Sequence, residues 1–171
     1  MQDRTPDIAT ATPKGEALLA RARELAPVFR SRAAAAEKAR SIPPESIAEL
    51  RAAGLLRTLQ PVVLGGFELP LDEAVLITAT VAEGCGPTGW IQGIFSDHCA
   101  TLGMFDGRAQ QDVWGESPDS LVSSGFLPAG KAVRVDGGYR LSGRWPFSSG
   151  CDHADWALVR SFVPGAGGGA P

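Results

Sequence analysis

Residues 121–150 read LVSSGFLPAGKAVRVDGGYRLSGRWPFSSG. Two serine pairs, Ser123-Ser124 and Ser148-Ser149, lie in this stretch, and an alternating segment with Asp136-Gly137-Gly138 at its centre separates them. An Asp-Gly or Gly-Gly step between alternating segments is typical of a β-hairpin. Two antiparallel strands joined in this way bring both serine pairs to one end of a sheet.

The whole chain divides into a helical part and a β-part. Apolar residues recur at three- and four-residue steps in the first part, whereas short β-favouring segments broken by Gly and Pro make up the second. We expect helices over 15–40, 44–53, 71–83, 87–104 and 106–114, and the first of them is expected to be kinked or divided at Pro27. We expect strands over 121–122, 131–135, 139–142 and 156–162, with a turn at 127–130 between the first two. This order predicts an α+β fold, with a helical domain followed by an incomplete antiparallel β-domain.

The same patterns give the expected domain boundaries. Residues 1–13 carry no periodicity and are expected to form a flexible arm. The helical domain is expected over 14–116 and the start of the β-domain over 117–163. Residues 164–171 read PGAGGGAP, a composition typical of a flexible tail.

Composition narrows the class of protein. The chain has 171 residues, 44% of them hydrophobic, and a net charge of −3 with scattered basic residues, so no nucleic-acid partner is expected. No apolar run approaches the roughly 20 residues of a membrane span, and the N-terminus lacks a signal-peptide core, so we expect a cytoplasmic protein without a membrane partner. Cys85, Cys99 and Cys151 are widely separated and are expected to be buried small residues, not a disulfide framework or a metal site.

Residues 145–150 have the chemistry of a pocket for a flat heteroaromatic ring. Trp145 and Phe147 offer apolar faces, and the neighbouring hydroxyls and glycine amides can meet polar ring edges. An ordinary hairpin with a Ser-Gly turn and buried aromatic residues is an open alternative. On the helical side, Trp90, Ile94 and His98 fall four residues apart and are expected to share one helical face. For His98, a buried core histidine is the alternative to a functional one.

A succession of motifs resembles the acyl-CoA dehydrogenase superfamily. The motifs are Ile42-Pro43-Pro44-Glu45-Ser46-Ile47-Ala48-Glu49-Leu50, Ala53-Gly54-Leu55, Gly65-Gly66-Phe67, Pro87-Thr88-Gly89-Trp90 and Gly143 to Gly150. Within the superfamily the chain is most similar to oxygenase components of two-component flavin-dependent monooxygenases, which hydroxylate 4-hydroxyphenylacetate, steroid-derived phenols or polyketides. The resemblance implies a longer protein with a C-terminal helical bundle, which this sequence lacks, so the chain is interpreted as an N-terminal fragment.

The resemblance also implies roles for individual residues. His98, Ser124 and Ser149 are the implied catalytic residues, with His98 on the substrate side of the flavin. A hydroxyl two residues after the aromatic Phe147, that of Ser149, would bond to flavin N5 and restrain loss of peroxide from a flavin hydroperoxide. Cofactor contacts are implied for Trp90, Ser123, Ser124, Phe147, Ser148 and Ser149. Hydroxyls that only satisfy strand ends are the alternative for the serines.

The implied reaction uses reduced FMN or FAD (FMNH2 or FADH2) and O2 to hydroxylate an aromatic or polyketide-like substrate. A separate NAD(P)H-flavin reductase would supply the flavin, in keeping with the absence of a Gly-x-Gly-x-x-Gly fingerprint from this chain. The full-length form is expected to be a homotetramer. Two alternatives are open, namely an acyl-CoA dehydrogenase that oxidises thioesters with FAD, and an inactive truncated helical domain.

Overall fold

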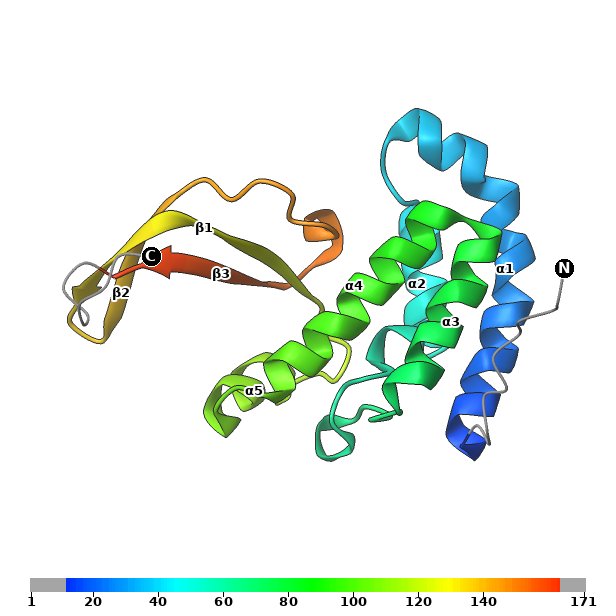
Figure 1. The fold of residues 1–171 in the computed structure, drawn as a ribbon, viewed down its shortest axis with the longest axis horizontal. Coiled ribbons are helices and arrows are strands. Elements are labelled where there is room, and N and C mark those ends of the chain that lie inside the picture. The colour runs from blue at the N-terminus through cyan, green and yellow to red at the C-terminus, as the bar shows by residue number, and fades with distance from the viewer. Residues whose placement is uncertain (1–11, 164–171) are drawn as a thin grey trace, which may run out of the picture. The chain divides into compact units, whose positions relative to one another are not determined.

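Helices make up the first part of the structure and strands the second. The computed structural model describes residues 12–163, and the chain divides between Ser120 and Leu121 into two compact units (Figure 1). The described part of the first unit contains α1 Pro13–Ala39, α2 Pro44–Ala52, α3 Leu71–Gly84, α4 Gly86–Gly103 and α5 Gly107–Trp114. Two 3-10 helices, η1 Leu55–Arg57 and η2 Val62–Leu64, connect α2 to α3. The five expected helices are therefore present, with ends shifted by at most two residues.

The start of α1 is fixed by a contact that the sequence does not reveal. The hydroxyl of Thr12 accepts a hydrogen bond from the N–H of Gly15 at 3.1 Å. The backbone N–H and the hydroxyl of Thr12 donate to the two carboxylate oxygens of Glu73 on α3, at 2.6 and 2.9 Å. Because the N-terminus of a helix favours a negative charge, the buried Glu73 carboxylate stabilises this end of α1 and ties it to α3.

Helix α1 runs unbroken through Pro27, so of the two expected effects of this proline, a kink or a division, the helix is not divided. Proline removes one backbone hydrogen bond from a helix interior. Both halves of α1 nevertheless bury apolar side chains, including Leu18 and Ala22 before the proline and Phe29 after it. Burial on both sides of Pro27 offsets the lost bond.

The helices of the first unit pack closely at glycines. A Cβ atom at Gly84 of α3 would lie 2.8 Å from the Cα of Ala26 on α1, closer than real contacts allow. Similarly, a Cβ at Gly93 of α4 would lie 2.9 Å from the Thr78 side chain on α3. Figure 1 shows α1, α3 and α4 side by side. The largest fully buried apolar side chains of the unit are Phe29, Phe95, Leu18, Leu50, Leu55, Leu56, Ile77, Leu102 and Val81.

A buried polar seam joins α4 to the segment around η1. A 3-10 helix leaves backbone carbonyls without internal partners, and α4 supplies donors to them. Gln92 donates to the Leu55 carbonyl at 2.8 Å, and the Cys99 thiol lies 3.6 Å from the Leu56 carbonyl. The hydroxyl of Ser96 is hydrogen-bonded to that of Thr58, another buried pair. Burial raises the pKa of the Cys99 thiol to about 12, which keeps it protonated.

The second unit is a three-stranded sheet of order β2-β1-β3, with β1 Val122–Val135, β2 Gly138–Gly143 and β3 Trp156–Phe162 (Figure 1). Strands β1 and β2 form the expected antiparallel hairpin, and Gly137 in its turn has a φ of 76°. Strand β3, however, pairs parallel to β1, so the sheet is mixed. The long connection over 144–155 permits this pairing, because it carries the chain across β1 before β3 begins.

The expected turn at 127–130 is wrong, because β1 continues through these residues. Gly125 pairs with Val159 and Gly130 with Ser161, so four residues of β1 stand opposite Arg160 alone. Pro128 lies within this irregular stretch, where no regular ladder requires its missing N–H. A proline and a glycine that normally mark a turn thus lie inside one irregular strand.

Some expectations concern residues outside the described range. The flexible arm was expected over 1–13 and the flexible tail over 164–171, and of these residues the structure describes only 12 and 13. Cys151 departs from the expected burial, because it lies at the start of the 3-10 helix Cys151–His153 (η3) and is exposed, whereas Cys85 and Cys99 are buried. None of the helices in the described residues is long and apolar enough to cross a membrane.

Candidate functional site

Helix α4 carries two of the predicted site residues, and it exposes them very differently. The side chain of His98 is buried, with 1% of its surface exposed, whereas Trp90 is 63% exposed and Ile94 is intermediate. Eight residues along a helix accumulate a rotation of about 80° beyond two full turns. Trp90 and His98 therefore lie about 80° apart around the helix axis, and His98 is on the buried side.

Strand β1 carries the first serine pair at its start. Ser123 pairs with Ala157 and Ser124 with Leu158 of β3, and both serines are buried. The Ser123 hydroxyl donates to the carbonyl of Trp156 at 3.4 Å. Because side chains alternate along a strand, the two serines point to opposite faces of the sheet.

The second serine pair lies in the connection between β2 and β3, directly after Phe147. Phe147 has a φ of 59°, the left-handed region that costs a non-glycine residue roughly 1–2 kcal/mol. Its ring is 90% exposed. The N–H of Ser149 donates to the Phe147 carbonyl at 3.1 Å, and that of Cys151 donates to the Ser148 carbonyl at 3.1 Å. These bonds hold an exposed aromatic ring and two half-buried serines in one tight loop.

The chain contacts the start of β1 on both sides of the loop of residues 146–150, at Trp145 and at residues 155–156. On one side, a Cβ at Gly125 would lie 2.7 Å from the Cβ of Trp145, so this tryptophan rests on the strand next to Ser124. On the other side, the N–H groups of Asp155 and Trp156 donate to the Leu121 carbonyl at 2.9 and 3.0 Å. The two serine pairs are therefore flanked by residues in mutual contact, and their roles in catalysis remain predictions.

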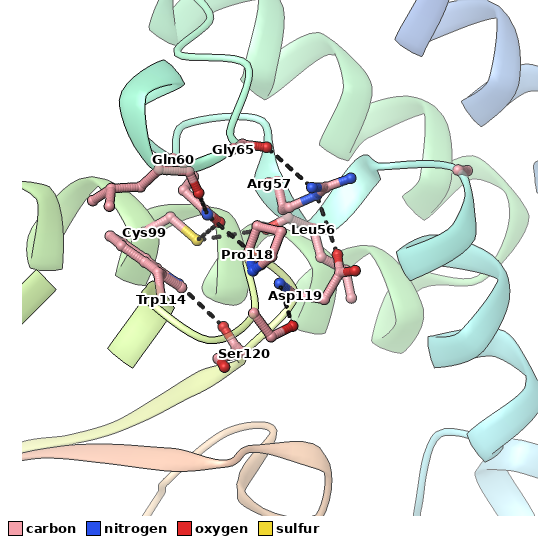
Figure 2. Close-up of polar contacts among 12 residues, drawn as sticks. Leu56, Arg57, Gln60, Gly65, Cys99, Trp114, Pro118, Asp119 and Ser120 are labelled. Atoms are coloured by element: carbon pink, nitrogen blue, oxygen red, sulfur yellow. Dashed lines mark hydrogen bonds and ion pairs between the residues drawn. The ribbon is translucent and has the colours of Figure 1, made fainter. Parts of the chain in front are cut away.

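Sequence reasoning missed a cluster that anchors the last residues of the helical unit, 117–120 (Figure 2). Gln60 donates to the carbonyls of Leu64 and Pro118, at 2.8 and 3.1 Å. The indole N–H of Trp114 donates to the Ser120 carbonyl at 3.2 Å. No motif or spacing indicates these contacts, because the accepting partners are backbone carbonyls, and that of Pro118 lies 58 residues from Gln60.

Arg57 is the charged member of the same cluster. Its guanidinium donates to the Gly65 carbonyl at 3.0 Å and lies 5.8 Å from the centroid of the Phe67 ring. Its Nε lies 3.2 Å from Oδ1 of Asp119, close enough for an ion pair but misaligned for a hydrogen bond. Figure 2 shows Arg57 between the Gly65 carbonyl and Asp119, which lies in the segment that leads to β1. The exit of the chain from the helical unit is thus fixed by side chains.

The loop at 147–149 combines an aromatic ring with two hydroxyl groups. An isoalloxazine offers two flat apolar faces and polar edges, and the loop offers an exposed aromatic face with hydroxyls one and two residues away. No group of three or more His, Cys, Asp or Glu side chains suited to a metal ion occurs among residues 12–163.

Comparisons with known proteins find relatives of this chain. The chain is 40% identical over 154 residues to the oxygenase component of the FADH2-dependent resorcinol hydroxylase of Rhizobium sp., covering 90% of the chain and 38% of that protein. It superimposes with a TM-score of 0.83 and 41% identity on the HsaA monooxygenase of M. tuberculosis, over 87% of the chain and 39% of that structure. The structure of XiaF from Streptomyces sp. with FADH2 and glycerol matches with a TM-score of 0.83 and 28% identity, over 88% and 39%.

These matches place the chain in a family while covering only part of its relatives. The chain spans less than two-fifths of the length of the relatives named above. The family model for the acyl-CoA dehydrogenase N-terminal domain matches residues 12–114, more than half of the chain. The chain therefore belongs to the acyl-CoA dehydrogenase family, whose N-terminal domain its helical unit contains.

Proposed function

We propose that the protein containing this chain is the oxygenase component of a two-component flavin-dependent monooxygenase that hydroxylates an aromatic substrate. Relatives named as a resorcinol hydroxylase and as the HsaA monooxygenase support the reaction class. The observation in this chain that carries the proposal is the loop at Phe147, which presents an exposed ring beside two serines. The chain covers only part of these relatives, so the activity is proposed for the complete protein.

Reduced flavin is the proposed cofactor, and it supplies the electrons with which O2 is activated. FADH2 is favoured over FMNH2, because one relative is named for it and another structure contains it. Phe147 would lie against the flat ring, with Trp90 as a further apolar contact from the helical unit. Ser123 and Ser148 would contribute mainly through their backbone; for Ser123 the side chain alternates with that of Ser124 along β1.

The catalytic roles fall to three side chains. The hydroxyl oxygen of Ser149 would accept a hydrogen bond from N5–H of the reduced flavin, which would restrain loss of oxygen as peroxide. Ser124 would contact the pyrimidine side of the ring. His98 is almost fully buried, and an imidazole shielded from water can hold or move the proton of a phenolic substrate without competition from solvent.

The proposal includes the partners of the complete protein. A separate reductase that draws on NAD(P)H would deliver the flavin, as the description of the relatives as components implies. A homotetramer is the proposed assembly. A cytoplasmic location is proposed because the reductase draws on NAD(P)H.

The test uses the complete protein encoded by the reading frame that contains this sequence. Ser149→Ala should leave the affinity for reduced flavin within about fivefold, the factor that one net hydrogen bond carries. It should lower the fraction of consumed O2 that appears as hydroxylated product and raise the release of H2O2. The matched control is Ser142→Ala, an exposed serine of β2, which should behave as wild type. Unchanged coupling in Ser149→Ala would refute the role of this hydroxyl.

A dehydrogenase is the second candidate, and the family model itself favours it, because the model is that of an acyl-CoA dehydrogenase domain. The two candidates need different substrates and different redox states of the flavin. Oxidation of an acyl-CoA thioester by the complete protein with oxidised FAD, without consumption of reduced flavin, would establish the dehydrogenase.

A further inference from the structure

Trp145 occupies a cradle of glycines on one face of the sheet. A Cβ at Gly130 would overlap the indole ring, one at Gly125 would lie 2.7 Å from the Trp145 Cβ, and one at Gly143 would lie 3.2 Å from Cη2. None of these three glycines has a positive φ. Space for the indole therefore accounts for glycine at positions 125 and 130 of β1, whereas a Cβ at Gly143 of β2 would first meet the Cα of Gly130, at 2.6 Å.

The indole N–H also completes the irregular pairing of β1 and β3. Between Gly125 and Gly130 the register shifts, so Arg160 has no partner residue on β1. The indole Nε1 of Trp145 donates to the Arg160 carbonyl at 2.8 Å. The bond is exposed to solvent and ties the indole to the backbone of β3 at this irregularity.

This seat lies immediately before the loop of the proposed flavin site. One residue, Pro146, separates Trp145 from Phe147, and the proline ring fixes its own φ, so little freedom remains between the two aromatic residues. Ser149 follows two residues later and is bonded to the Phe147 carbonyl. Trp145, Phe147 and Ser149 thus lie within one stretch of five residues.

We propose that Trp145 is a positioning residue that sets the geometry of Phe147 and Ser149 toward the flavin without touching the flavin itself. The proposal rests on the proposed function. In this proposal, the hydrogen bond from the indole N–H to the Arg160 carbonyl fixes the point at which the loop leaves the sheet. Gly125 and Gly130 are then constrained because the indole needs their space.

The test compares Trp145→Phe with Trp156→Phe in the complete protein. Trp145→Phe keeps an aromatic ring in the cradle but removes the bond to Arg160, whereas Trp156 is a half-exposed tryptophan of the same sheet. Without flavin, amide hydrogen exchange at Ser149 and Cys151 should rise about fivefold in Trp145→Phe, the factor of one net hydrogen bond, and stay unchanged in α1, α3 and α4. With flavin, affinity and coupling should both fall. Trp156→Phe should change none of these quantities.

Gly130→Ala is the second variant, because it displaces the indole without removing its N–H. It should reproduce the faster exchange at the loop and the loss of coupling. Unchanged exchange at Ser149 in both variants, or faster exchange with wild-type flavin affinity and coupling, would overturn the role of Trp145. If the wild-type protein itself binds no reduced flavin, the proposed function fails, whereas the exchange experiment still reports on the loop.

Discussion

Replacement of Arg57 by methionine should destabilise the helical unit by about 2 kcal/mol. Methionine keeps an apolar stem of similar length and removes the guanidinium. The bond to the Gly65 carbonyl, 3.0 Å long and near the surface, contributes about 1 kcal/mol. The ion pair with Asp119, whose side chains are 22% and 37% exposed, contributes about 0.5 kcal/mol after screening by solvent. The stacking on Phe67 adds about 0.5 kcal/mol.

The assay is urea unfolding followed by far-ultraviolet circular dichroism, with Arg108→Met on α5 as the control. Arg108 has an exposed side chain, and its replacement should change the free energy of unfolding by less than about 0.5 kcal/mol. A double-mutant cycle of Arg57→Met with Asp119→Asn isolates the ion pair, whose coupling should be about 0.5 kcal/mol. If Arg57→Met lowers the free energy of unfolding by less than about 0.5 kcal/mol, Arg57 does not anchor residues 117–120.

Two further predictions concern the helical unit and its thiols. Gly84→Ala should lower the thermal midpoint, because the added Cβ overlaps the backbone of Ala26 and overpacking costs about 1–3 kcal/mol; a wild-type midpoint would show that α1 and α3 are not in contact here. In native protein a thiol reagent at mildly alkaline pH should modify Cys151 and spare Cys85 and Cys99, and modification of all three would contradict the burial. Burial raises the pKa of Cys99 from 9.0 to about 12. The contribution of Cys99 to stability is therefore complete below pH 9 and is lost as the pH rises towards 12. Cys99→Ala should abolish this loss of stability with rising pH.

The helical unit could be predicted because its signals are local. Apolar spacing marks the buried faces, and Asp106, which accepts a bond from the N–H of Arg108 at 2.9 Å, caps α5 as its position suggests. The contact of Thr12 with Glu73 could not be predicted, because it joins residues 61 positions apart. Pro128 and Gly130 misled the strand prediction, since both normally end strands and here lie in an irregular stretch of β1.

The candidate site was predictable in kind but not in detail. The order of the serine pairs and of Phe147 along the chain indicated the loop, and the structure holds that loop against the start of β1. The seat of Trp145 escaped prediction, because the sequence presents the residue as one more aromatic ring beside Phe147. Only the register shift between β1 and β3 shows why its N–H is needed at the Arg160 carbonyl.

One measurement tests the proposed function most directly. The complete protein is loaded anaerobically with FADH2 and a phenolic substrate such as resorcinol, then mixed with O2, and product and H2O2 are quantified in a single turnover. The proposal predicts tight binding of the reduced flavin and a hydroxylated product that accounts for most of the O2 consumed. Failure to bind reduced flavin, or complete conversion of the O2 to H2O2 with every phenolic substrate tried, would contradict it.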